Sequence, residues 1–160
     1  MAVIAFIGCG NMGGALAKAA AKSPRTDRLL LSNRTTEKAA RLAEELGAEV
    51  CDNATAAREA DVLFLAVKPQ GLEAMVAGIR GELSARKRVL IVSMAAGWTL
   101  EELTALLGAH PVVRIMPNIP VAVGGGVTML CASDAVTEQE KELSRSCWPP
   151  QGWSRSSLSR

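Results

Sequence analysis

A chain of 160 residues is long enough for one domain with a hydrophobic core and too short for the two-domain layout of most dehydrogenases. With 49% hydrophobic and 21% charged residues it has the composition of a packed soluble protein, and its net charge of +2 argues against a nucleic-acid partner. No apolar run approaches the length of a membrane span, and no charged leader precedes the first apolar stretch, so we expect a cytoplasmic protein without membrane association.

Short apolar runs alternate with alanine- and leucine-rich segments along the chain. The runs predict strands at 2–7, 28–31, 62–67, 88–92 and 112–116, with a short additional strand at 48–51. The segments between them predict amphipathic helices at 12–22, 35–46, 69–80 and 99–107. Strands that are apolar throughout and separated by helices are typical of a parallel sheet covered on both faces. The sequence therefore predicts an α/β fold, a Rossmann-like doubly wound domain with a mostly parallel sheet.

Several helices carry recognisable start signals. Thr35 or Thr36 suits an N-cap, Pro69 suits a first helical turn, and the TLEEL stretch from Thr99 has the capping-box pattern. The segment PNIPVAVGGG at 117–126 predicts a loop instead, because its prolines and glycines exclude regular helix.

A glycine pattern follows the first predicted strand and opens the first predicted helix. Gly8 permits a tight turn, Gly10 leaves room for a pyrophosphate at the backbone, and Gly13 lets helix and strand pack closely. The free N–H groups of the helix start would then face the phosphates. The alternative is that these glycines only form a tight turn in a protein that binds no nucleotide.

The end of the second strand, in the stretch LLLSNRT, indicates which dinucleotide is bound. An NAD enzyme normally places an acid there against the ribose hydroxyls, and this stretch has none. Arg34, with the hydroxyl of Ser32 or Thr35, would suit a 2′-phosphate, which favours NADP(H). The alternative is that Arg34 is a solvated charge before a helix. Asn53 is placed to reach the adenine side, although asparagine is also common in turns.

Three further strand ends carry loops of unusual composition, namely AVKPQ, SMAAG and RIMPNIP. In an open α/β sheet, ligands collect at the carboxyl ends of the strands, so these loops predict one groove. Lys68 in the first loop would reach a ribose or a substrate carboxylate, or would simply open a helix as a surface charge.

No metal site is expected. The four cysteines, Cys9, Cys51, Cys131 and Cys147, have no metal-binding spacing and have the character of small buried hydrophobic residues. The single histidine, His110, has no evident acidic neighbour, which favours a loop residue over a catalytic base.

Taken together, the motifs FIGCGNMG, SNRT, AVKPQ, SMAAG and RIMPNIP resemble the amino-terminal domain of pyrroline-5-carboxylate reductase over about residues 2–143. The resemblance implies NADPH-dependent reduction of the C=N bond of 1-pyrroline-5-carboxylate to L-proline. In that family a second, helical domain forms the dimer and carries the proton donor and the substrate carboxylate site, so no catalytic residue is assigned here. Trp98 is bulkier than the family pattern suggests. The implied cofactor contacts are Gly8, Cys9, Gly10, Asn11, Met12 and Gly13 for the pyrophosphate, Ser32, Asn33 and Arg34 for the 2′-phosphate, Asn53 for the adenosine half, Val67, Lys68 and Pro69 for the nicotinamide ribose, Ala95 and Gly97 for the nicotinamide, and Asn118 for its substrate end.

The character of the chain changes after residue 143. Residues 144–160 hold six serines, two tryptophans and three arginines without an acid, so we expect a domain at 1–143 and an aberrant tail at 144–160. Reading the back-translated codons from the third base of Cys147 forces Leu and then Ala, and allows LAAAGLVEV, which looks like the family's continuation. We therefore interpret the tail as a frameshifted translation that lacks the family's dimerisation domain. The alternative is a genuine short tail.

Two other functions stay open. One is a different NADP oxidoreductase with the same first domain, such as a hydroxyacid dehydrogenase or a deazaflavin-linked NADP reductase, although VKPQ followed by MPNIP argues against both. The other is a non-catalytic NADP-binding module or fragment.

Overall fold

The computed structural model describes residues 2–108, 110–117, 127–145 and 158–159. Its strands are β1 (Ala2–Ile7), β2 (Thr26–Ser32), β3 (Glu49–Val50), β4 (Val62–Leu65), β5 (Leu90–Ser93), β6 (Val112–Pro117), β7 (Val127–Ala132) and β8 (Leu158–Ser159). Within the described ranges these strands form one sheet in the order β3-β2-β1-β4-β5-β6-β7-β8.

The helices lie between the strands, as the alternating sequence pattern predicts. They are α1 (Asn11–Ala21), α2 (Thr36–Leu46), α3 (Asn53–Glu59), the 3-10 helix η1 (Pro69–Gly71), α4 (Leu72–Ala85), α5 (Leu100–Leu107) and α6 (Glu138–Arg145). Every strand and helix expected from the sequence is present, with ends shifted by a few residues. The helix expected at 69–80 begins as η1 and continues as α4 to Ala85, while α3, β7 and β8 were not expected.

The sheet is mostly parallel, which confirms the predicted doubly wound α/β class. All ladders from β3 to β6 are parallel, β7 runs antiparallel to β6, and β8 pairs in parallel with β7. The chain builds β1, β2 and β3 outward in one direction, and α3 then returns it to β4 on the other side of β1. This reversal puts a topological switch point between β1 and β4, the place where ligands bind in open α/β sheets.

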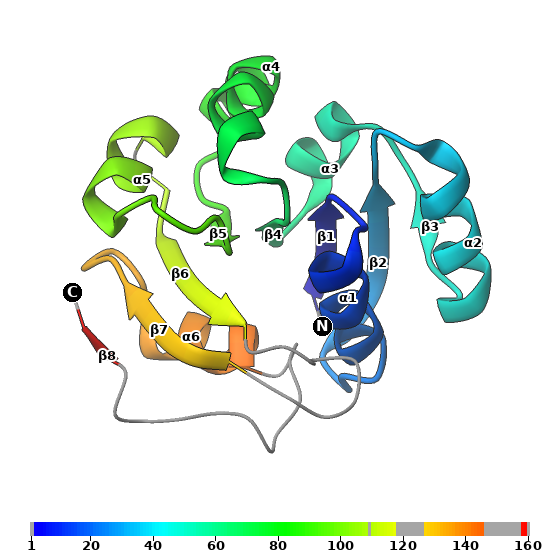
Figure 1. Ribbon diagram of the computed structural model, residues 1–160. Coiled ribbons are helices and arrows are strands. Elements are labelled where there is room, and N and C mark those ends of the chain that lie inside the picture. The colour runs from blue at the N-terminus through cyan, green and yellow to red at the C-terminus, as the bar shows by residue number, and fades with distance from the viewer. Residues whose placement is uncertain (1, 109, 118–126, 146–157, 160) are drawn as a thin grey trace.

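Two apolar layers hold the helices to the sheet. Alternate residues of β1 face opposite sides, so Ile4 and Phe6 join the layer with α1 and α2, whereas Ala5 and Ile7 join the layer with α3, α4 and α5. Figure 1 shows α3, α4 and α5 together on one side of the sheet. Phe6 stacks on Phe64 of β4 with ring centroids 4.4 Å apart. These layers fix the strands whose ends form the site.

Helix α6 belongs to the folded domain and ends two residues beyond the boundary expected at 143. Arg88, just before β5, contacts both carboxylate oxygens of Glu140, at 2.8 and 2.6 Å. Leu143 packs against the apolar layer of α1 and α2, and Ser144 is fully buried. The expected change of character at residue 144 therefore falls inside a helix. None of the helices in the described ranges is long and apolar enough to span a membrane.

Candidate cofactor site

The glycine loop lies at the switch point, against the residue that follows β4. Gly8 has a φ of +104°, and a Cβ there would lie 2.4 Å from the carbonyl oxygen of Ala66. A Cβ on Gly13 would lie 2.4 Å from the carbonyl oxygen of Gly8 and 2.8 Å from the Ala66 Cβ. Both positions require glycine because the turn and the helix-to-strand contact leave no room for a methyl group.

Gly10 differs from the other two glycines of the motif. No neighbouring atom lies within 4 Å of the point that a Cβ would occupy, and its φ of −72° suits any residue. Gly10 is the N-cap of α1, which has no side-chain cap and no acid in its first turn. The N–H groups of that turn are therefore available to an anion outside the loop. Asn11 and Met12 are the first two residues of α1, so their backbone N–H groups are part of this turn.

Asn33 connects the glycine loop to the end of β2. Its Oδ1 accepts the backbone N–H of Cys9 at 3.0 Å, and its Nδ2 donates to the carbonyl of Thr35 at 3.1 Å. The backbone N–H of Gly8 also donates to the Ser32 carbonyl at 2.7 Å. Asn33 thus holds the glycine loop against the end of β2, a role that the SNRT motif alone did not reveal.

The exposed groups at the end of β2 are Arg34 and Thr35 rather than Ser32. Ser32 is 3% exposed, and its hydroxyl donates to Oδ1 of Asn53, the first residue of α3, at 2.5 Å. Arg34 is exposed and makes no ion pair with the other described residues, and Thr35 makes no side-chain cap bond to α2. Of the two hydroxyls considered from the sequence, only that of Thr35 lies beside Arg34 on the surface.

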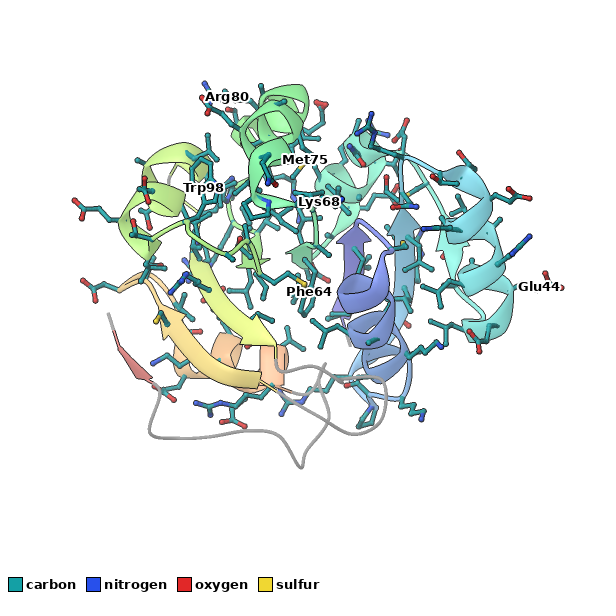
Figure 2. All side chains as sticks on the ribbon, in the orientation of Figure 1. Glu44, Phe64, Lys68, Met75, Arg80 and Trp98 are labelled. Atoms are coloured by element: carbon teal, nitrogen blue, oxygen red, sulfur yellow. The ribbon has the colours of Figure 1, made fainter. Side chains whose placement is uncertain are left out.

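On the other side of β1, two connections follow β4 and β5. Lys68 is exposed, and Val67 and Pro69 are half-buried at the start of η1. Figure 2 shows Lys68, Met75 and Trp98 on the side of the sheet that carries α4 and α5. After β5, Gly97 is exposed with a φ of +84°, whereas Ala95 is only 1% exposed. Asn118, expected at the substrate end, lies outside the described residues.

The two cysteines near the loop, Cys9 and Cys51, are weakly ionised thiols. Burial raises the pKa of the Cys9 thiol to about 11, and burial together with neighbouring carboxylates raises the pKa of Cys51 to about 11. Both are therefore protonated near neutral pH and too weakly ionised to act as nucleophiles. The described part of the chain contains no cluster of His, Cys, Asp and Glu that would hold a metal ion.

His110 is a structural residue on the opposite edge of the sheet. It is 6% exposed, its Nδ1 accepts the N–H of Val89 at 3.1 Å, and its Nε2 lies 2.7 Å from the carbonyl oxygen of Leu83. These partners require a neutral ring that carries its proton on Nε2. His110 lies in the loop before β6, as the sequence predicts.

Comparison with known proteins identifies the family. Residues 3–97 match the family model described as NADP oxidoreductase coenzyme F420-dependent. The chain belongs to this family. A pyrroline-5-carboxylate reductase of Corynebacterium melassecola is 36% identical over 148 residues, covering 89% of this chain and 54% of the relative.

Solved structures of the same enzymes are also similar to this chain. A pyrroline-5-carboxylate reductase from Coxiella burnetii matches with a TM-score of 0.80 at 30% identity, covering 91% of this chain and 56% of the other. A pyrroline carboxylate reductase from Plasmodium falciparum, solved with NADP bound, matches with a TM-score of 0.74 at 25% identity, covering 92% of this chain and 56% of the other. The chain corresponds to the amino-terminal NADP-binding domain of these reductases and spans about half their length.

Proposed function

We propose that this chain is the NADPH-binding domain of a pyrroline-5-carboxylate reductase. When bound, NADPH supplies a hydride that adds to the carbon of the C=N bond of 1-pyrroline-5-carboxylate while a proton goes to the nitrogen, giving L-proline. The observation that carries the cofactor part of the proposal is the glycine loop at the switch point, where Gly8 and Gly13 are sterically required and Gly10 faces open space. A loop that served only as a turn would not require an open, uncapped helix start beside Gly10.

The residues around the loop fit a dinucleotide phosphate. Gly8 to Gly13 would hold the pyrophosphate, with the uncapped N–H groups of α1 as donors and no acid in the first turn to repel it. Cys9 would contribute through the shape of the loop, because its backbone N–H already donates to Asn33 and its thiol is buried. The loop therefore binds through its backbone, and its side chains shape it.

The preference for NADPH over NADH rests on Arg34. This guanidinium is exposed and unpaired among the described residues, and Thr35 beside it presents a free hydroxyl. Ser32 and Asn33 would support the 2′-phosphate site indirectly, by holding Asn53 and the glycine loop in place. Asn53 would lie under the adenosine half.

The nicotinamide half would extend over β4 and β5, on the side of β1 away from β2. Val67, Lys68 and Pro69 would line its ribose, and Gly97 would approach the ring closely because it has no side chain. Ala95, nearly fully buried, would support that segment from beneath. We keep Asn118 as the contact at the substrate end.

The likeness to pyrroline-5-carboxylate reductases favours this enzyme over another NADP oxidoreductase with the same first domain. The family model ends at Gly97, but the likeness to the Corynebacterium reductase covers 89% of this chain and so continues past that point. The substrate assignment depends on this longer likeness.

We also propose that the tail lies outside the family's reading frame. The alternative codons begin at Cys147, and helix α6 ends at Arg145, so the shift would fall just after the last described residue of the helix. Nucleotide sequence around codon 147 tests this proposal. A second frame that stays open and encodes LAAAGLVEV supports it, and a second frame that closes within a few codons contradicts it.

Two assays on the 160-residue chain test the proposed function. Titration with NADPH should show saturable binding, and its absence would remove the proposal. A proline-forming assay should show little turnover, because the family's proton donor and substrate carboxylate site lie in its second domain. Robust proline formation would support the reaction but contradict the need for that domain.

A further inference from the structure

Trp98 links the two connections that flank the nicotinamide side of the proposed site. It follows Gly97 and precedes Thr99, the N-cap of α5. Its indole Nε1 donates to the carbonyl oxygen of Pro69 at 3.1 Å, across 29 positions of the chain. The ring is half-buried and packs against the apolar layer of α3, α4 and α5, as do Val67 and Met75. Figure 2 shows Trp98, Met75 and Lys68 on this side of the sheet.

This hydrogen bond lies beyond the end of the sheet ladder. The β4–β5 pairing ends at Leu65 and Ser93, and one long bond of 3.4 Å joins the N–H of Met94 to the Leu65 carbonyl. Past that point, in the described residues, the bond from Trp98 is the hydrogen bond that joins the two connections. Together with the packing of both connections against the apolar layer, it holds η1 against the segment that leads into α5.

The acceptor of this bond belongs to a turn that is already closed. The Pro69 carbonyl also accepts the N–H of Leu72, and the Lys68 carbonyl accepts the N–H of Gly71 at 2.9 Å. Because η1 keeps its own hydrogen bonds and continues into α4 at the buried Leu72, loss of the indole donor would leave the turn folded and remove only its bond to the segment that leads into α5. The expected effect is on spacing rather than on folding.

We propose that Trp98 is a positioning residue that holds Val67–Pro69 and Ala95–Gly97 at the separation required by the nicotinamide half of NADPH. This inference rests on the proposed function, in which the pyrophosphate occupies the glycine loop and the 2′-phosphate lies at Arg34. With β2 on one side of β1 and β4 and β5 on the other, the adenosine half does not reach Trp98. Trp98 therefore acts on one half of the cofactor and leaves the other unaffected.

The test compares two ligands on three proteins. The dissociation constants of NADPH and of adenosine 2′,5′-bisphosphate, which lacks the nicotinamide half, are measured by calorimetry for the unaltered chain, Trp98→Phe and Met75→Ala. Trp98→Phe keeps an aromatic ring but removes the N–H donor. It should weaken NADPH about fivefold, the factor that corresponds to one net hydrogen bond, and leave the bisphosphate unchanged. Met75→Ala truncates a side chain of the same layer without removing the hydrogen bond, so it should leave the ratio of the two dissociation constants unchanged.

The outcomes separate this inference from the proposed function. If the unaltered chain binds neither ligand, the proposed function and the inference both fail. If it binds both ligands and Trp98→Phe leaves the ratio of the two dissociation constants unchanged, only the role of Trp98 is overturned. Should Trp98→Phe not fold, 3-benzothienylalanine at position 98, in a Trp148→Phe and Trp153→Phe background, replaces the N–H by sulfur in a ring of the same shape. The same selective loss of NADPH affinity is expected from it.

Discussion

Substitution of Gly10 by alanine separates cofactor binding from folding. The added methyl group meets no atom within 4 Å, and the φ of −72° is compatible with alanine. The only expected cost in stability is about 0.5 kcal/mol, from the weaker N-cap. In the proposed complex the methyl group would stand between the pyrophosphate and the N–H groups of α1. Loss of one or two hydrogen bonds to a charged group costs about 3 kcal/mol, or about a hundredfold in the NADPH dissociation constant.

The assay pairs thermal unfolding with calorimetric titration, and Gly8→Ala serves as the contrasting variant. At Gly8 the methyl group would lie 2.4 Å from a backbone oxygen, at a φ of +104° that alanine disfavours, so this variant should lose stability before any ligand is added. Gly10→Ala should unfold close to the unaltered chain and bind NADPH weakly. Unchanged NADPH affinity in a folded Gly10→Ala chain would refute the placement of the pyrophosphate.

Three further outcomes follow from the geometry. Arg34→Ala should weaken NADPH about tenfold, the low end for an exposed charged contact, and NADH hardly at all in parallel titrations; equal losses would remove its assigned role. His110→Ala should lower the free energy of unfolding in urea by about 3 kcal/mol, because it leaves a buried N–H and a buried carbonyl unpaired; a loss below about 0.5 kcal/mol would contradict this structural role. Cys9 and Cys51, with pKa values raised to about 11, should alkylate at pH 8 about a hundredfold more slowly in the folded chain than after unfolding, as mass spectrometry would show; equal rates would indicate exposed, ionised thiols.

Local sequence signals predicted most of the fold, because each signal reflects an interaction between residues that are close in the chain. The run at 2–7 forms β1, and the Thr99 pattern forms a complete capping box with Glu102, with bonds of 3.0 and 3.1 Å. Helix α3 was missed because its seven residues carry alanines without a longer apolar stripe, although Asp52 was a usable N-cap signal. The antiparallel direction of β7 follows from its pairing with β6, which no local pattern encodes.

The sequence predicted which strand ends form the candidate site, but not the side-chain contacts of the residues within it. The carboxyl ends of neighbouring strands meet at one edge of the sheet, so the glycine loop, Arg34 and Lys68 could be grouped from the chain order alone. The inward turn of Ser32 depends on where α3 begins, because its hydroxyl bonds Asn53. The bond from Trp98 to Pro69 joins two connections that are distant in sequence, so the sequence showed only that the residue was unusually large.

Calorimetric titration of the 160-residue chain with NADPH and, separately, with NADH tests most directly whether this domain binds NADPH in preference to NADH. We predict saturable binding of one NADPH per chain and affinity for NADH that is about tenfold weaker, because Arg34 has a 2′-phosphate to contact only in NADPH. Absence of saturable NADPH binding, or equal affinity for the two cofactors, would contradict this claim.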